Sequence, residues 1–152
     1  MLEEIKMSFD GQLLAPNQYG ALTLAYIGDC VYEMYVRSYL ISKGDHRVND
    51  LHKKATKLVC AKAQAAFYRR IEVLLTEEEQ AAFHRGRNTK SQVPKNAVLS
   101  DYRTATGVET LLGHLYLKNE TQRISQLMAY LFSGETAGQS KEKYMYTYTQ
   151  EV

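Results

Sequence analysis

Residues 19–44, YGALTLAYIGDCVYEMYVRSYLISKG, decide which fold we expect. Apolar side chains recur in this stretch at three- and four-residue steps, which predicts a helix from Tyr19 to Lys43 that Gly44 ends. The apolar positions are Leu24, Ile27, Val31, Met34 and Ile41 on one side, and Leu22, Ala25, Val36 and Leu40 on the other. A helix that is apolar on both sides is typical of the centre of a core, so we expect this helix to be buried.

The rest of the chain also favours helices. Helical spacing runs from about Asn49 to Leu74, and Thr76 followed by Glu79 forms a capping box for a shorter helix through about His84. Two more helices are expected over residues 100–117 and 121–132. The sequence therefore predicts an all-α helical bundle.

Between these helices, residues 86–96 contain Pro94 and lack an apolar period, which favours a loop. The chain has no internal repeat and no linker between domains. We expect an N-terminal lead-in over residues 1–18, one folded domain over residues 19–134, and a flexible tail over residues 135–152.

The composition of the 152 residues is that of one globular domain, with 45% hydrophobic and 24% charged residues. No apolar run is long enough to span a membrane, and the first residues, MLEEIKMSFD, lack an export signal. Cys30 and Cys60 stand singly, as reduced cytoplasmic thiols do. These features exclude a secreted disulfide scaffold, a zinc ribbon and a membrane protein, and we expect a cytoplasmic protein.

Positive charge is concentrated in two segments, although the net charge is only +2. Residues 43–70 contain eight Lys and Arg against two Asp, and the stretch FHRGRNTKSQVPKN adds four cations and no acid. A single basic helix face is more often a solvated surface, but two such clusters favour binding of nucleic-acid phosphates. The candidate contacts are Lys53, Lys54, Arg85, Arg87, Asn88, Lys90, Lys95 and Asn96.

Two acidic residues lie where an apolar core would exclude them. Asp29 follows Gly28 in the middle of the first helix, where both residues oppose helix formation and where we expect burial. Glu109, in GVETLLGHLYL, shares a helical face with small residues that would let another helix approach closely. Two buried carboxylates beside a basic surface suit Mg²⁺. The alternative is structural: Asp29 as a cap or a partner of a buried Lys or Tyr, and Glu109 in an ion pair.

Several motifs, in order, resemble those of a known family. ALTLAYIGDCVYEMYVR resembles the signature helix of the ribonuclease III domain, and GVETLLGHLYL resembles the second acidic motif of that domain. Between them, LHKKATKLVCAKAQA, FHRGRNTKS and VPKNA match the short Mini-ribonuclease III branch. The resemblance covers the chain from about Gly20 to Phe132. It implies an all-α endonuclease domain that acts as a homodimer on double-stranded RNA with Mg²⁺, for which Mn²⁺ can substitute.

The same resemblance assigns Asp29 and Glu109 as the metal-binding catalytic residues. Larger family members carry further acids where this chain has Ala25 and Thr106, and the Mini branch shares both departures. We expect no double-stranded-RNA-binding domain after Phe132, so RNA would bind to the basic surface of the dimer itself. In this branch the associated task is trimming of the 23S ribosomal RNA precursor, helped by a ribosomal protein bound to the same RNA.

Two competing interpretations belong to other functional classes. The first is a noncatalytic RNA-binding or ribosome-associated module on a nuclease fold, for which the two retained acids have no use. The second is a helix-turn-helix DNA-binding protein, which would need a short basic recognition helix and would not explain Asp29.

Overall fold

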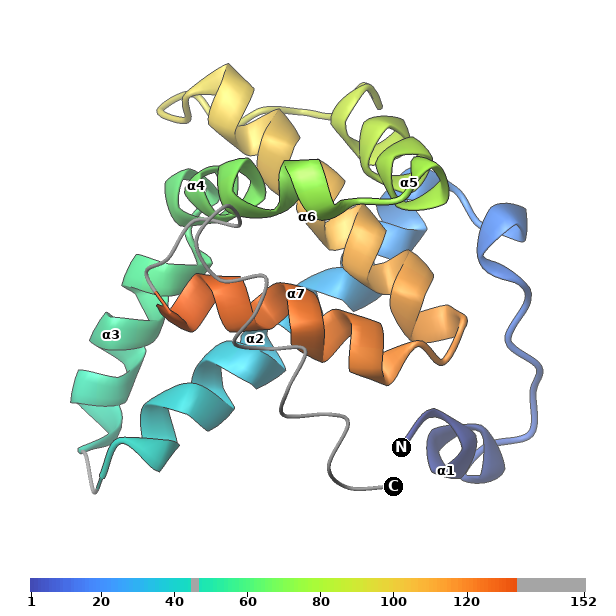
Figure 1. Ribbon diagram of the computed structural model, residues 1–152, viewed down its shortest axis with the longest axis horizontal. Coiled ribbons are helices and arrows are strands. Elements are labelled where there is room, and N and C mark those ends of the chain that lie inside the picture. The colour runs from blue at the N-terminus through green and yellow to red at the C-terminus, as the bar shows by residue number, and fades with distance from the viewer. Residues whose placement is uncertain (45–46, 134–152) are drawn as a thin grey trace.

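The computed structural model describes residues 1–44 and 47–133, and the described part is an α-helical bundle, as predicted (Figure 1). The predicted tail over residues 135–152 lies outside the described residues. Within the described part, no helix combines the length and the apolar character needed to cross a membrane. The α-helices are α1 (Leu2–Met7), α2 (Ala21–Ser42), α3 (Val48–Val59), α4 (Ala61–Ile71), α5 (Glu77–Arg87), α6 (Leu99–Leu117) and α7 (Thr121–Ser133), with short 3₁₀ helices η1 (Pro16–Gln18) and η2 (Glu72–Leu74).

The central helix of the bundle is α6, and not α2 as the sequence suggested. α6 packs against α2, α4, α5 and α7 and is buried over most of its length. α2 is buried along one side only: Leu24 and Val36 are inaccessible, whereas Tyr26 is 79% exposed and Met34 48% exposed. The prediction that α2 is buried on both sides is therefore wrong for the single chain. The buried residues come from both predicted sides, and the helices packed against α2 leave uncovered a side that includes Leu22, Tyr26 and Met34.

Glycines let α2 and α6 cross with their backbones in contact. A Cβ atom added to Gly28 would overlap the carbonyl oxygen of Glu109 and lie 2.8 Å from the backbone nitrogen of Gly113. A Cβ atom on Gly113 would likewise overlap the carbonyl oxygen of Leu24. Gly28 is thus required by helix packing, and the close approach that the small residues of α6 predicted is confirmed.

The predicted helix over residues 49–74 is interrupted. Cys60 adopts an extended conformation (φ −65°, ψ 156°) that ends α3 and begins α4. Two side chains take up the carbonyls at the end of α3: the Tyr32 hydroxyl donates to Leu58 O (2.8 Å) and Gln64 Nε2 donates to Val59 O (3.1 Å). The break has no Gly or Pro signal, and it is stabilised by a hydroxyl from α2 and by an amide of α4 itself.

The ends of the later helices follow their sequence signals. Thr76 Oγ1 accepts from the Glu79 backbone N–H (3.2 Å) while Glu79 Oε2 accepts from the Thr76 N–H (2.9 Å), which confirms the capping box of α5. α5 continues past His84 to Arg87, so the loop before α6 covers residues 88–98. After α6, Asn119 adopts a left-handed conformation (φ 58°) that turns the chain into α7.

Candidate active site and RNA-binding surface

Glu109 occupies the point where α6 crosses α2. Its backbone carbonyl lies against Gly28, its side chain is half-buried, and its neighbours Ala105 and Thr106 are buried. Burial raises the pKa of Glu109 to about 7; a hydrogen bond from Gln64 Nε2 (3.0 Å) opposes this shift, and the negative charge of Asp29 adds to it. Glu109 forms no ion pair among the described residues, so the structure does not support the ion-pair alternative.

Asp29 lies on the same crossing, one residue after Gly28, but its side chain is exposed. The prediction that it is buried is wrong for the single chain, because Asp29 faces the uncovered side of α2. Surrounding protein atoms nevertheless crowd the carboxyl group enough to raise its pKa, and the negative charge of Glu33 raises it further. Asp29 has no hydrogen-bond or ion-pair partner within the described residues, so it is neither a cap nor a partner of Lys or Tyr there.

The two carboxyl groups suit a hard divalent cation. They come from different helices, and the negative charge of Asp29 disfavours the ionised form of Glu109. Mg²⁺ is commonly held by one or two carboxylates, with waters and substrate phosphate oxygens as its other ligands. In the described part of the chain, no three His, Cys, Asp or Glu side chains come together as a metal cluster. Asp29 and Glu109 are therefore a pair of carboxyl groups at this crossing without a third such ligand in the described residues.

Ala25 and Thr106, the positions where larger family members carry acids, are both buried in this crossing. Thr106 Oγ1 donates to Tyr102 O (3.1 Å), so its hydroxyl is engaged within α6. Neither side chain adds a carboxylate to the site.

Gln64 is a polar residue at the site that the sequence analysis missed. It is 2% exposed and lies on the inward side of α4 with Ala65, Phe67 and Ile71. The signal was present in the sequence, since Gln64 is the one polar side chain among these inward positions of α4. Its contact with Glu109 depends on the packing of α4 against α6.

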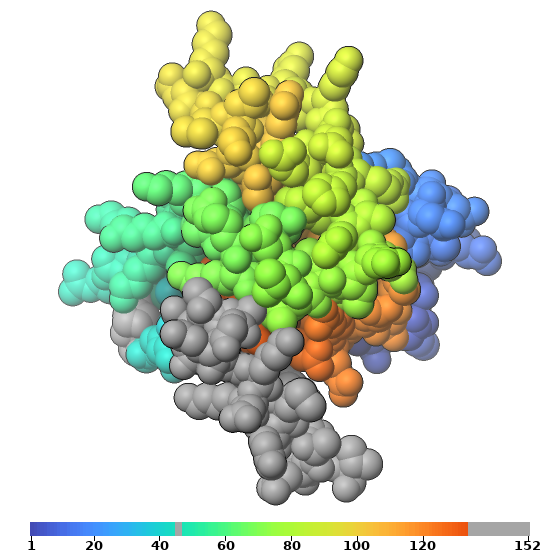
Figure 2. Space-filling view, turned by 45° about the horizontal axis from the view of Figure 1, so that its top comes forward, coloured from blue at the N-terminus to red at the C-terminus, as the bar shows by residue number. Residues whose placement is uncertain are grey.

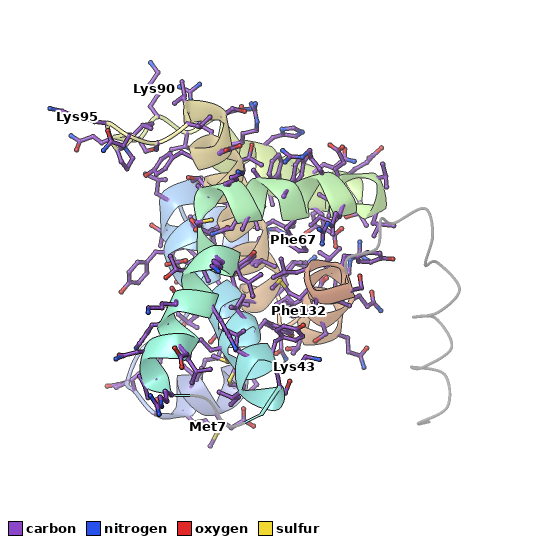
Figure 3. The ribbon with its side chains drawn as sticks, turned by 90° about the vertical axis from the view of Figure 1, so that its left-hand side faces the viewer. Met7, Lys43, Phe67, Lys90, Lys95 and Phe132 are labelled. Carbon is purple, nitrogen blue, oxygen red and sulfur yellow. The ribbon has the colours of Figure 1, made fainter. Side chains whose placement is uncertain are left out.

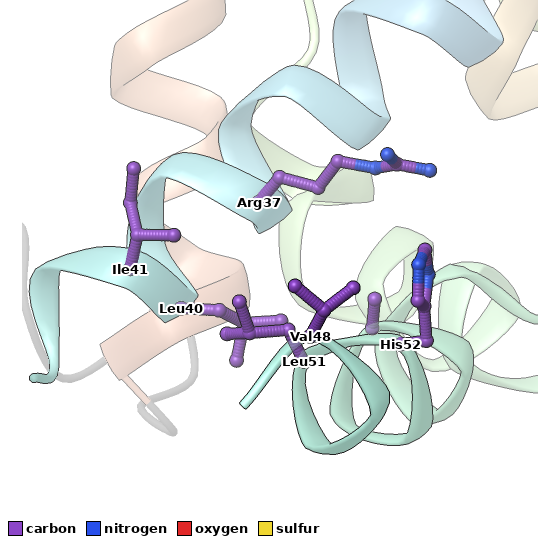
Figure 4. A pocket seen from close by; sticks show the side chains of 7 residues that line it. Arg37, Leu40, Ile41, Val48, Leu51 and His52 are labelled. Atoms are coloured by element: carbon purple, nitrogen blue, oxygen red, sulfur yellow. The ribbon is translucent and has the colours of Figure 1, made fainter. Parts of the chain in front are cut away.

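The hollow between α2 and α3 is separate from the two carboxylates. A hollow of about 220 Å³ between α2 and α3 is lined by Arg37, Leu40, Ile41, Val48, Leu51, His52 and Ala55, and neither Asp29 nor Glu109 belongs to it (Figure 4). The candidate active site is at the surface, which an extended polymer can reach.

α3 carries two of the residues predicted to contact RNA. Lys53 and Lys54 are exposed, while Leu51, Ala55 and Leu58 are half-buried toward the core. α3 and the 88–98 loop lie at two corners of the molecule with α4 between them (Figures 1 and 3).

The loop contacts divide into two groups. Lys90, Lys95 and Asn96 are exposed, and the two lysines point away from the core that contains Phe67 (Figure 3). Figure 2 shows this loop projecting beyond the body of the molecule. We call Lys53, Lys54, Lys90 and Lys95 the basic surface.

The three residues at the end of α5 have structural contacts as well. Arg85 donates from Nη2 to the carbonyl oxygen of Tyr19 (2.6 Å), Arg87 is half-buried, and Asn88 is the C-terminal cap of α5. Arg85 therefore holds α5 to the end of η1, just before α2, a role that the sequence did not indicate.

Comparisons with known proteins agree with this fold. The sequence model of the family described as "Ribonuclease III domain" matches residues 22–120. Mini-ribonuclease 3 from Clostridium tetani is 54% identical over 114 residues, covering 74% of this chain and 76% of that protein. Mini-ribonuclease 3 from Enterococcus faecalis is 43% identical over 130 residues, covering 84% of this chain and 97% of that protein. A crystal structure of a Fusobacterium nucleatum protein superposes with a TM-score of 0.70 at 29% identity, covering 76% and 93% of the two chains.

An all-α domain whose residues 22–120 match this family model is a ribonuclease III domain. The chain belongs to the ribonuclease III family, in its Mini-ribonuclease III branch, and is an endoribonuclease. The interpretations as a noncatalytic binding module and as a DNA-binding protein are set aside on these matches.

Proposed function

We propose that this endoribonuclease cleaves double-stranded RNA by metal-assisted hydrolysis of a phosphodiester bond, with Asp29 and Glu109 holding Mg²⁺. The observation that supports this is the pair of carboxyl groups from α2 and α6: burial raises the pKa of Glu109, and the negative charge of Asp29 raises it further. When bound, the ion would lower the pKa of a coordinated water and neutralise charge on the phosphate. Ribonucleases of this family generally use a divalent metal ion.

The other steps, binding the ion and binding the RNA, would be carried out by different residues of the chain. Glu109 is fixed by the α2–α6 crossing, so its carboxylate presents charge at a constant position. Asp29 supplies the second carboxylate at the surface. The basic surface would bind backbone phosphates of the duplex, with Arg85, Arg87, Asn88 and Asn96 beside it. Because the base edges of A-form RNA lie deep in a narrow major groove, recognition would depend on shape, 2′-hydroxyls and phosphates.

The enzyme is proposed to act as a homodimer, as ribonuclease III enzymes generally do. Leu22, Tyr26, Cys30 and Met34 follow four-residue steps along the uncovered side of α2 and are all exposed in the single chain. A second copy on this apolar stripe would bury it and would also cover the surroundings of Asp29. Sedimentation equilibrium should show a dimer that a Met34→Arg variant converts to monomer.

The proposed natural substrate is the 23S ribosomal RNA precursor in the cytoplasm, assisted by a ribosomal protein on the same RNA. Support for this choice is the membership of the Mini-ribonuclease III branch. Wild-type protein should trim a precursor stem in the presence of Mg²⁺, and the ribosomal protein should increase the rate.

The direct test of the mechanism uses Asp29→Asn and Glu109→Gln, which keep side-chain volume and remove charge. Single-turnover cleavage of duplex RNA with Mg²⁺ should fall by at least about a thousandfold in either variant, because the ion loses a ligand. Duplex binding measured in EDTA should match wild type. Cleavage at the wild-type rate by either variant would disprove the assignment, and Mg²⁺-independent cleavage would disprove the metal mechanism.

A further inference from the structure

Gln64 is a buried glutamine whose amide group makes hydrogen bonds to two different helices. Its amide nitrogen donates one hydrogen to Val59 O (3.1 Å) at the end of α3 and the other to Glu109 Oε1 (3.0 Å) on α6. At 2% exposure the side chain is shielded from solvent. One buried amide thus joins the basic helix α3 to a candidate catalytic carboxylate.

The orientation of this amide is determined by its neighbours. Val59 O is an acceptor, and so is the Glu109 carboxylate when it is ionised, so reversing the amide would then place its oxygen against two acceptors. The amide oxygen of Gln64 has no partner among the described residues and is itself buried. A buried polar atom without a partner costs free energy. The fold tolerates this cost at the amide oxygen while both amide hydrogens are hydrogen-bonded.

The contact also makes the two carboxyl oxygens of Glu109 different from each other. Oε1 accepts from Gln64, whereas Oε2 has no hydrogen-bond partner in the described part of the chain and is not among its buried unpaired atoms. A carboxylate held by one oxygen keeps the other free and oriented. This is the arrangement by which residues behind a metal ligand orient it.

We propose that Gln64 is a positioning residue that fixes the Glu109 carboxylate for metal binding, through the bond from its Nε2 to Glu109 Oε1. The inference rests on the proposed function, since it requires that Glu109 bind the ion. It adds that α4 supplies part of the metal site without supplying a ligand. The buried Gln64 also couples the end of α3 to that site.

The test is Mn²⁺ binding to the full chain, measured by calorimetry or by the electron paramagnetic resonance signal of the free ion. Gln64→Met keeps an unbranched side chain of similar length and removes both donors. It should weaken Mn²⁺ binding by about tenfold, the effect typical of residues that orient ligands. The Mg²⁺ concentration for half-maximal cleavage should rise similarly, and duplex binding in EDTA should not change.

The matched control is Tyr32→Phe. It removes the hydroxyl that donates to Leu58 O at the same junction, and Tyr32 makes no hydrogen bond to Glu109. This variant should lose stability and keep wild-type Mn²⁺ affinity. If both variants weaken Mn²⁺ binding equally, Gln64 supports only the junction and the proposal is overturned.

A double variant tests the route. In a Glu109→Ala background, Gln64→Met should cause no further loss of Mn²⁺ affinity, because the carboxylate through which it acts is gone. A further tenfold loss would show that Gln64 acts elsewhere. Gln64→Leu provides a second apolar replacement should the Met variant not fold. Wild-type affinity in a folded Gln64 variant overturns this inference alone, whereas wild-type protein that binds no Mn²⁺ overturns the proposed function with it.

Discussion

The acidic residues at the α2–α6 crossing and the lysines of the basic surface differ in how firmly the structure holds them. At the crossing, backbones touch through Gly28 and Gly113, and Glu109 is half-buried and hydrogen-bonded. On the basic surface, Lys90 and Lys95 are exposed and have no ion-pair partner among the described residues. At the crossing, helix packing holds the Glu109 carboxyl group in one position, which suits cleavage of one particular bond. On the basic surface, the lysine side chains are not held by partners, which suits binding of a polyanion of variable sequence.

The largest stability effect should come from the crossing. Gly28→Ala would place a methyl group on the backbone of Glu109, 2.6 Å from the carbonyl carbon, and backbone cannot move aside as a side chain can. We expect the free energy of unfolding to fall by about 3 kcal/mol, as overpacking does. Urea denaturation measures this change, and cleavage should fall with it because the two carboxylates separate.

The control for this variant is Gly20→Ala. A Cβ atom at Gly20 would meet no atom within 4 Å, so only the loss of a glycine cap at the start of α2 is involved. That loss should cost less than about 1 kcal/mol. Equal stability losses in both variants would show that the close contact of the helices is not what requires Gly28.

The contrast between the two regions also separates what the sequence could predict from what it could not. The ends of α2, α6 and α7 were predicted within two residues, because apolar spacing and capping residues are local signals. Glu109 was identified correctly as an acid inside a packed face. Exposed cations could also be identified, because solvation does not depend on distant neighbours.

Where tertiary contacts decide, the sequence was insufficient. Both sides of α2 are apolar, so nothing local indicates which side α6 covers, and Asp29 was therefore placed inside. The break at Cys60 depends on donors from Tyr32 and Gln64. The bond from Arg85 to Tyr19 O joins residues far apart in the chain. The six-residue helix α1 is too short to show an apolar period.

A smaller effect is expected from the basic surface. The double variant Lys90→Ala/Lys95→Ala should weaken duplex RNA binding by about tenfold and reduce the slope of log affinity against log salt by about two, since two phosphate contacts are lost. Because neither lysine is ion-paired, the melting temperature should not change. Binding titrations at several salt concentrations, in EDTA, measure the slope.

The corresponding control removes two cations that the structure already pairs. Lys6 bonds Glu3 at 3.0 Å, and Lys118 bonds Glu78 at 2.7 Å. Lys6→Ala/Lys118→Ala removes the same formal charge and should leave the slope unchanged. A slope that falls equally in both double variants would mean that net charge, and not the loop, attracts the RNA.

The smallest effect should be a pH dependence of stability that originates at the crossing. The pKa of Glu109 is about 7 in the folded chain, above its ordinary value of 4.5, and the pKa of Asp29 is also raised. The folded state therefore keeps a proton at Glu109 that the unfolded chain has already released. Stability from this residue is present below pH 4.5 and is lost as the pH rises toward 7.

Without metal, the melting temperature of wild-type protein should consequently decline more between pH 5 and 7.5 than that of Glu109→Gln, by about 3 °C. Asp10→Asn, which neutralises an exposed carboxylate, should follow the wild-type profile. Adding Mg²⁺ at pH 7.5 should raise the melting temperature of wild type and not that of Glu109→Gln, because the ion stabilises the ionised carboxylate that burial disfavours. Identical pH profiles for wild type and Glu109→Gln would mean that solvent reaches Glu109 freely, and the crossing would then hold its charge no differently from the basic surface.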